Sequence, residues 1–142
     1  MRVVIDTNVM VSGVLNPYGP PGRILSALLA GTIVTLYDER ILSEYREVLF
    51  RPAFGLSRSD VEVLLNFVEA TGEHISAEPL SQVLPDPTDL PFLEVAASGD
   101  ADTLITGNSK HFKPQRGQHS VLVTTPADFL RCEGDLSSLR KR

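Results

Sequence analysis

The chain has 142 residues, a length typical of one domain with its own hydrophobic core. Hydrophobic residues make up 42% of it and charged residues 22%, as in soluble globular proteins. Thirteen Lys and Arg against eighteen Asp and Glu give a formal net charge of −5. This charge argues against a protein that coats nucleic acid, although a local basic patch facing a phosphate is compatible with it.

A single cysteine, Cys132, excludes an internal disulfide bond and fits a reducing compartment. We see no basic stretch leading into an apolar one, as in a signal peptide, and no apolar run long enough to span a bilayer. We therefore expect a soluble, cytoplasmic protein with no membrane partner.

Strand-like and helix-like segments alternate in the first half of the chain. Three β-branched residues, Val3–Ile5, indicate a strand buried on both faces. The segment 9–15 is mostly apolar and leads into a loop rich in Pro and Gly. Further strands are predicted at 32–37 and 74–76. Helices are predicted from Pro21 to a stop at Gly31, from the cap Asp38 to about Phe50, and from the capping box Ser59-x-x-Glu62 through Val68, closed by Gly72.

The second half continues the alternation. A polar loop from Asp86 enters a short helix that ends at Gly99, and strands are predicted at 103–106 and 121–124. A last short helix covers 126–130. This pattern predicts an α/β fold with a mostly parallel central sheet, in one domain spanning 1–132, followed by a loose tail at 133–142.

Polar side chains follow two of the predicted strands directly. Asp6 comes after the first strand, and Asn108 lies just beyond the strand at 103–106. In open α/β sheets, ligands bind beyond the carboxyl ends of the strands, so Asp6 is suitably placed for chemistry. Two simpler interpretations stay open: Asp6 caps the following helix, and Asn108 is only a turn residue.

Two further carboxylates are candidates for the same site. On the helix after Asp38, Glu44 lies at the border of the apolar stripe, from which it could lean over the end of the sheet; an ordinary solvated glutamate is the alternative. Asp89 lies in the first turn of its helix, where the helix dipole favours an anion, and simple capping is again the alternative.

The segments that hold these residues resemble the PIN-domain ribonucleases. The resemblance covers nearly the whole chain, and its motifs follow one another in the right order. The matching residues are Ile5-Asp6-Thr7-Asn8, Glu44, Asp86-Pro-Thr-Asp89 with Phe92 and Ala96, and Leu104-Ile-Thr-Gly-Asn108. It is strongest to the branch of VapC-like toxins from toxin–antitoxin systems. The resemblance implies a three-layer α/β/α sandwich, cleavage of RNA with Mg²⁺ or Mn²⁺, a small antitoxin as partner, and a homodimer.

The resemblance also assigns roles to residues. Asp6, Glu44 and Asp89 are the expected catalytic acids, and together with Asn108 they are the expected metal ligands. Hard divalent cations prefer such oxygen ligands, and crowded carboxylates repel one another unless a cation neutralises them. Residues expected to support these ligands or to orient the substrate are Thr7, Asn8, Asp86, Thr106, Lys110 and His111.

Asn108 departs from the family pattern, because the fourth acidic position is here an amide that brings no charge. We therefore expect weaker binding of a second metal and lower activity. The stretch after Asn108 is basic, with Lys110, His111, Lys113, Arg116 and His119 before the next acidic residue, Asp128. It is either a solvated loop or, beside the site, a surface that attracts a phosphate backbone.

Two other functional classes remain open on the sequence. A PIN-like binding module would hold RNA or a protein partner without cutting, and Asn108 favours it. An aspartyl phosphatase would also place an Asp after the first strand. That chemistry normally needs a second Asp two residues later, where this chain has Asn8, so we disfavour it.

Overall fold

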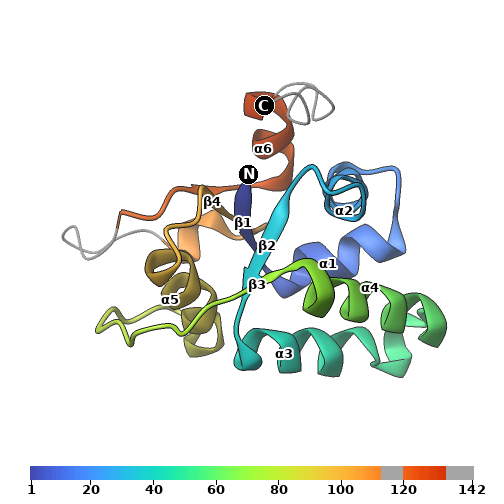
Figure 1. The fold of residues 1–142 in the computed structure, drawn as a ribbon, viewed down its shortest axis with the longest axis horizontal. Coiled ribbons are helices and arrows are strands. Elements are labelled where there is room, and N and C mark those ends of the chain that lie inside the picture. Colours follow the sequence, from blue (N-terminus) through green and yellow to red (C-terminus); the bar gives the residue numbers. More distant parts are fainter. Residues whose placement is uncertain (113–119, 134–142) are drawn as a thin grey trace.

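The computed structural model describes residues 1–112 and 120–133. Within them, the chain forms a five-stranded sheet in which all strands are parallel, with the order β3-β2-β1-β4-β5 (Figure 1). The strands are β1 (Arg2–Ile5), β2 (Val34–Tyr37), β3 (Glu73–His74), β4 (Thr103–Ile105) and β5 (Val123–Thr124). The predicted α/β fold with a parallel sheet is confirmed.

Six α-helices of the described residues surround the sheet: α1 (Thr7–Leu15), α2 (Pro20–Leu29), α3 (Glu39–Leu49), α4 (Arg58–Thr71), α5 (Leu90–Ser98) and α6 (Pro126–Glu133). Single 3₁₀ turns occur at η1 (Pro52–Phe54), η2 (Pro87–Asp89) and η3 (Ser109–Phe112). Figure 1 shows α5 on one side of the sheet and α1, α2 and α4 on the other, as in an α/β/α sandwich.

The central strand β1 positions the rest of the molecule. Its residues Val3, Val4 and Ile5 are fully buried, as expected for a strand covered on both faces. β1 pairs with β2 on one side and β4 on the other, and Ile5 lies beside Ile105. The Asp6 N–H then donates to the Ile105 carbonyl at 3.0 Å. The carboxyl ends of β1 and β4 are therefore adjacent, and the polar residues that follow them meet at one edge of the sheet.

Several predicted boundaries differ from the structure. Helix α4 begins with Ser57 as its N-cap, whose side chain accepts from the Asp60 N–H, so the proposed capping box at Ser59 was wrong. The first helical residue of α4 is Arg58, so the residue before it, Ser57, supplies the capping hydroxyl. The strand predicted at 74–76 is found one residue earlier, as β3 at Glu73–His74, and the strand predicted at 121–124 is shorter, as β5 at Val123–Thr124. Each of these strands pairs over two residues.

The C-terminal predictions are only partly covered. Helix α6 extends to Glu133, one residue beyond the predicted end of the domain at 132. The predicted loose tail at 133–142 lies outside the described residues from 134 onward. Among the helices of the described chain, none has the length and apolarity needed to cross a membrane.

Candidate active site

Asp6 is a buried carboxylate at the carboxyl end of the central strand. Only 4% of the residue is exposed, and its Oδ2 accepts a hydrogen bond of 2.7 Å from the Thr106 hydroxyl, which follows β4. Asp6 occupies the N-cap position of α1, but its side chain makes no capping hydrogen bond. The backbone N–H groups of Thr7 and Asn8, at the start of α1, nevertheless favour its charged form by lowering its pKa.

Asn108 is connected to Asp6 through its backbone. Its N–H donates to the Thr106 hydroxyl at 3.1 Å, and that hydroxyl in turn donates to Asp6. The residue itself is exposed. The turn at 107–108 thus orients Thr106, and the structure records no contact between the Asn108 amide and the carboxylates.

Glu44 leans toward the site from α3. It is half-buried, and its Oε2 accepts a hydrogen bond from the Thr7 hydroxyl at the start of α1. The neighbouring Tyr45 is fully buried and donates its hydroxyl to the carbonyl of Ile5, the last residue of β1. These two bonds attach α3 to the end of the central strand, so Glu44 is not the freely solvated glutamate of the alternative interpretation.

Asp86 and Asp89 flank the 3₁₀ turn η2 that leads into α5. Asp86 caps this turn, because its Oδ1 accepts from the Thr88 N–H at 3.0 Å and the Thr88 hydroxyl at 2.7 Å. Asp89 is half-buried at the N-cap position of α5 and makes no capping hydrogen bond with its side chain. Capping therefore accounts for Asp86 but not for Asp89.

The pKa values show that these carboxylates share one electrostatic field. Burial raises the pKa of Asp6, and the Thr106 hydrogen bond opposes this rise. Burial also raises the pKa of Glu44, helped by the charges of Asp6 and Asp86 and opposed by the Thr7 hydrogen bond. The pKa of Asp89 rises to about 6, through burial and then through repulsion from Asp6, Asp86 and Glu44. Among the described residues, no Lys or Arg lowers the pKa of these three acids, and only the charge of His111 partly offsets the repulsion, at Asp89.

Two other buried acids show the opposite arrangement. The Arg40 guanidinium donates to Asp38 Oδ2 at 2.7 Å and to Glu94 Oε1 at 2.7 Å. Asp38 also caps α3 by accepting from the Ile41 N–H at 3.0 Å, as predicted. In the described parts of the chain, no Lys or Arg forms an ion pair with Asp6, Glu44 or Asp89. Asp38 and Glu94 are therefore paired with an arginine, whereas the acids of the candidate site have no Lys or Arg partner among the described residues.

The uncompensated acids fit a hard divalent cation by their chemistry, since all their donor atoms are oxygens. As arranged, however, no three acid, imidazole or thiol groups of the described residues lie at metal-binding distances. Asp6 and Glu44 are each hydrogen bonded to a threonine hydroxyl instead. The expected ligand set of Asp6, Glu44, Asp89 and Asn108 remains a prediction.

The remaining predicted residues lie around this site. Asn8 and Lys110 are exposed, whereas His111 is half-buried next to the fully buried Phe112. The charge of His111 lowers the pKa of both Asp86 and Asp89, which places the imidazole near η2. The other members of the basic stretch, Lys113, Arg116 and His119, lie outside the described residues.

Comparison with known families bears directly on this arrangement. The model of the PIN domain matches residues 2–110, a span that includes every acid described above. The chain belongs to the PIN-domain family. PIN domains are generally nucleases and typically use divalent metals.

A curated protein is similar to this PIN domain over most of its length. It is an uncharacterized protein of Methanocaldococcus jannaschii, 28% identical over 141 residues that cover 92% of this chain and 90% of the relative. No solved structure gives a significant match to this PIN domain.

Sequence reasoning missed the pairing of Arg40 with Glu94. Glu94 is 4% exposed and also accepts from the Leu80 N–H at 2.7 Å. A signal was present, because Glu94 is the one charge in the apolar run 90–97. A charge inside such a run is costly unless it is paired, and its partner lies 54 residues earlier in the chain.

Proposed function

We propose that this PIN domain is a cytoplasmic Mg²⁺- or Mn²⁺-dependent endoribonuclease that hydrolyses phosphodiester bonds of RNA. The observation that carries the proposal is the uncompensated charge of Asp6, Glu44 and Asp89 at the carboxyl end of a parallel sheet. Mutual repulsion raises the pKa values of such acids, and a divalent cation would relieve it.

The site residues would divide the work as follows. Asp6, Glu44 and Asp89 would hold the cation, which when bound supplies Lewis acidity toward an attacking water and a phosphate oxygen. Thr106 and Thr7 would orient the Asp6 and Glu44 carboxylates through the hydrogen bonds they already make. Lys110 and His111 would attract the phosphate backbone of RNA to this edge of the molecule.

Cleavage of a labelled single-stranded RNA by the purified protein tests this proposal. We expect cleavage with Mn²⁺ or Mg²⁺ and none with EDTA, and we expect addition of excess Mn²⁺ to reverse the effect of EDTA. Cleavage that continues in EDTA would contradict a metal-dependent reaction.

An apolar groove supports the further proposal that the protein is a toxin held by a small antitoxin. The groove has a volume of about 320 Å³ and is lined mainly by apolar residues of α1, α2 and α4, among them Val14, Leu25 and Leu29. Two leucines of α2, Leu25 and Leu28, are buried in the core. Leu15 and Leu29, by contrast, are 52% and 49% exposed.

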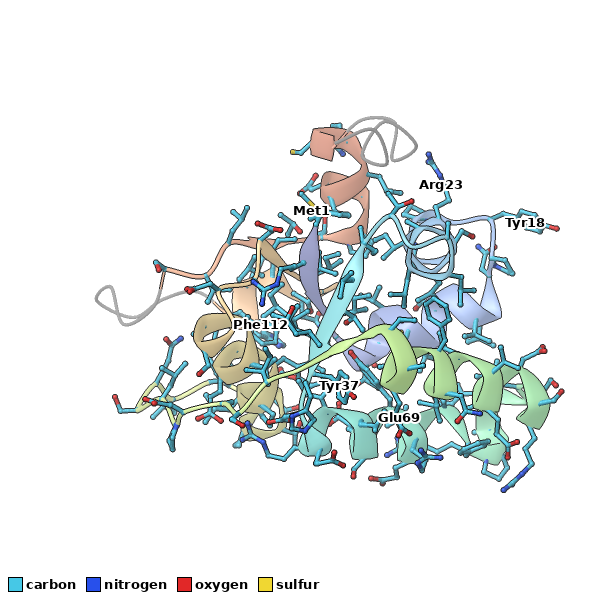
Figure 2. The ribbon with its side chains drawn as sticks, in the orientation of Figure 1. Met1, Tyr18, Arg23, Tyr37, Glu69 and Phe112 are labelled. Atoms are coloured by element: carbon cyan, nitrogen blue, oxygen red, sulfur yellow. The ribbon has the colours of Figure 1, made fainter. Side chains whose placement is uncertain are left out.

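The surface around the groove is also apolar. Val63, on the α4 wall, is 63% exposed, and Tyr18 projects from the loop between α1 and α2 (Figure 2). Exposed apolar surface of this kind is typical of a binding site for an amphipathic helix. We expect an antitoxin helix to bind here.

Val63→Asp tests the groove, with Leu122→Asp as a control at another exposed apolar residue. We expect Val63→Asp to lose the co-purifying antitoxin when both genes are expressed together, while Leu122→Asp keeps it. Sedimentation of the isolated variants tests the expected homodimer. If Val63→Asp instead turns a dimer into a monomer and still binds the antitoxin, the groove joins two copies of this chain.

A binding module without activity is the second candidate. It is favoured by the absence of metal-binding spacing among the described acids and by the neutral Asn108. RNA that binds to the protein but stays intact with Mn²⁺ would support this candidate.

A further inference from the structure

Arg40 bridges two acids that belong to different parts of the fold. Its Nε and Nη2 donate to Asp38 Oδ2 at 2.9 and 2.7 Å, and its Nη1 donates to Glu94 Oε1 at 2.7 Å. Asp38 follows β2 and caps α3, whereas Glu94 lies on α5. The guanidinium therefore joins the start of α3 to the middle of α5.

Glu94 extends this bridge to a third segment. Its second oxygen, Oε2, accepts from the Leu80 N–H in the irregular stretch between β3 and η2. Both oxygens of this buried carboxylate are thus used, which is what makes the burial of its charge tolerable. The segment anchored at Leu80 leads directly to Asp86.

The same three segments carry Glu44, Asp86 and Asp89, whereas Asp6 follows β1. Arg40 and Glu44 are four residues apart on α3 and therefore lie on one face of that helix. Asp89 stands at the start of α5, the helix that carries Glu94. Next to Glu44, Tyr45 packs against Phe92 of α5, with ring centroids 6.3 Å apart. The ion pair and this ring contact form the junction between α3 and α5.

We propose that Arg40 is a positioning residue that sets the distance between Glu44 and Asp89 by bridging Asp38 and Glu94. The proposal rests on the proposed function, since it assumes that these acids bind a divalent cation. Arg40 itself does not touch the cation or the RNA.

The direction in which cation affinity changes when Arg40 is removed distinguishes a positioning role from a simple effect of its charge. If Arg40 influenced the site only through its positive charge, its removal would strengthen the binding of a cation, because Asp38 and Glu94 would lose their compensation. If Arg40 positions α3 against α5, its removal must weaken cation binding even though the site becomes more negative.

Calorimetric titration of the full-length protein with Mn²⁺ measures this effect without reference to activity. We expect Arg40→Gln to bind Mn²⁺ roughly tenfold more weakly than wild type, as when other supporting partners of metal ligands are lost. The control is Arg46→Gln, which removes the same charge from the same helix at an exposed pair with Glu69 of α4. Its Mn²⁺ affinity should match that of wild type.

Equal or tighter Mn²⁺ binding by Arg40→Gln would overturn the proposal. If that variant does not fold, Arg40→Lys decides the question, because it keeps the charge but lacks the fork that reaches two carboxylates. Weaker binding by Arg40→Lys supports positioning, and unchanged binding overturns it. If wild type binds no Mn²⁺, the proposed function and this inference both fall. If wild type binds Mn²⁺ and the Arg40 variants bind it just as tightly, only this inference falls.

Discussion

The hydroxyl of Thr106 donates to Asp6 Oδ2 at 2.7 Å, although 100 residues separate them in the chain. The contact is possible because β1 and β4 are parallel neighbours that end at the same edge of the sheet. It lowers the pKa of a carboxylate whose pKa burial raises. The sheet thus supplies both the buried acid and a hydroxyl that favours its charged form.

Thr106→Val tests this relationship. Loss of the hydroxyl should raise the pKa of Asp6 further and move the acid limb of the cleavage pH profile upward. The free energy of unfolding should fall by about 1 kcal/mol, as for other buried hydrogen bonds. Thr106→Ser should restore both values toward wild type.

Thr103→Val, at the first residue of β4, provides a matched control for Thr106→Val, at the residue that follows this strand. Thr103 is buried, and its hydroxyl bonds to Leu122 and Thr124, away from the acids. Thr103→Val should lower the free energy of unfolding by a similar amount and leave the cleavage pH profile unchanged. If both variants shift the profile equally, the effect belongs to the strand and not to Asp6.

Asp89 should make stability depend on pH in the metal-free protein. Its pKa is about 6 in the folded state against an ordinary value of 3.8. The folded state therefore binds this proton more tightly than the unfolded state does. The contribution to stability is complete below about pH 3.8 and is lost as the pH rises through about 6.

Asp89→Asn stays neutral and should avoid that loss. In EDTA, we expect the variant to be more stable than wild type by about 1 kcal/mol at a pH well above 6, because solvent screens part of the repulsion at this half-buried group, with little difference near pH 4. Urea unfolding at the two pH values measures this. Asp100→Asn, at an exposed residue whose φ of 50° suits Asn, should show no such difference. An Asp89→Asn advantage of equal size at both pH values would contradict the assigned pKa.

Asn108→Asp tests the neutral position in the family pattern. Its backbone N–H bond to Thr106 does not depend on the side chain, so the turn should survive the change. If residue 108 can reach the cation, the new carboxylate should strengthen Mn²⁺ binding, and Mn²⁺ should raise the melting temperature more than in wild type. An identical Mn²⁺ dependence of the melting temperature would show that Asn108 only shapes the turn.

The sequence indicated the central features of this site but not its supporting contacts. Asp6 could be placed because a run of β-branched residues ends there, and parallel strands bring their carboxyl ends together. The bond between Thr7 and Glu44 could not be predicted, since it depends on how α1 and α3 pack.

The bridge of Arg40 was also beyond sequence reasoning. On the helix pattern Arg40 is an exposed cation, and only the packing of α3 against α5 brings Glu94 within 2.7 Å of it. The side chain of Asn108 is exposed, and its expected role as a metal ligand stays a prediction that the motif alone suggests.

RNA cleavage by Asp6→Asn is the most direct test of the central claim. The amide keeps the size of the buried side chain and can still accept from Thr106, so the circular dichroism spectrum and melting temperature should indicate an intact fold. With saturating Mn²⁺, we predict that wild type cleaves a labelled single-stranded RNA and that Asp6→Asn is slower by at least about 100-fold, as for loss of an essential catalytic group. Cleavage by folded Asp6→Asn at the wild-type rate would contradict the claim that this carboxylate organises the active site.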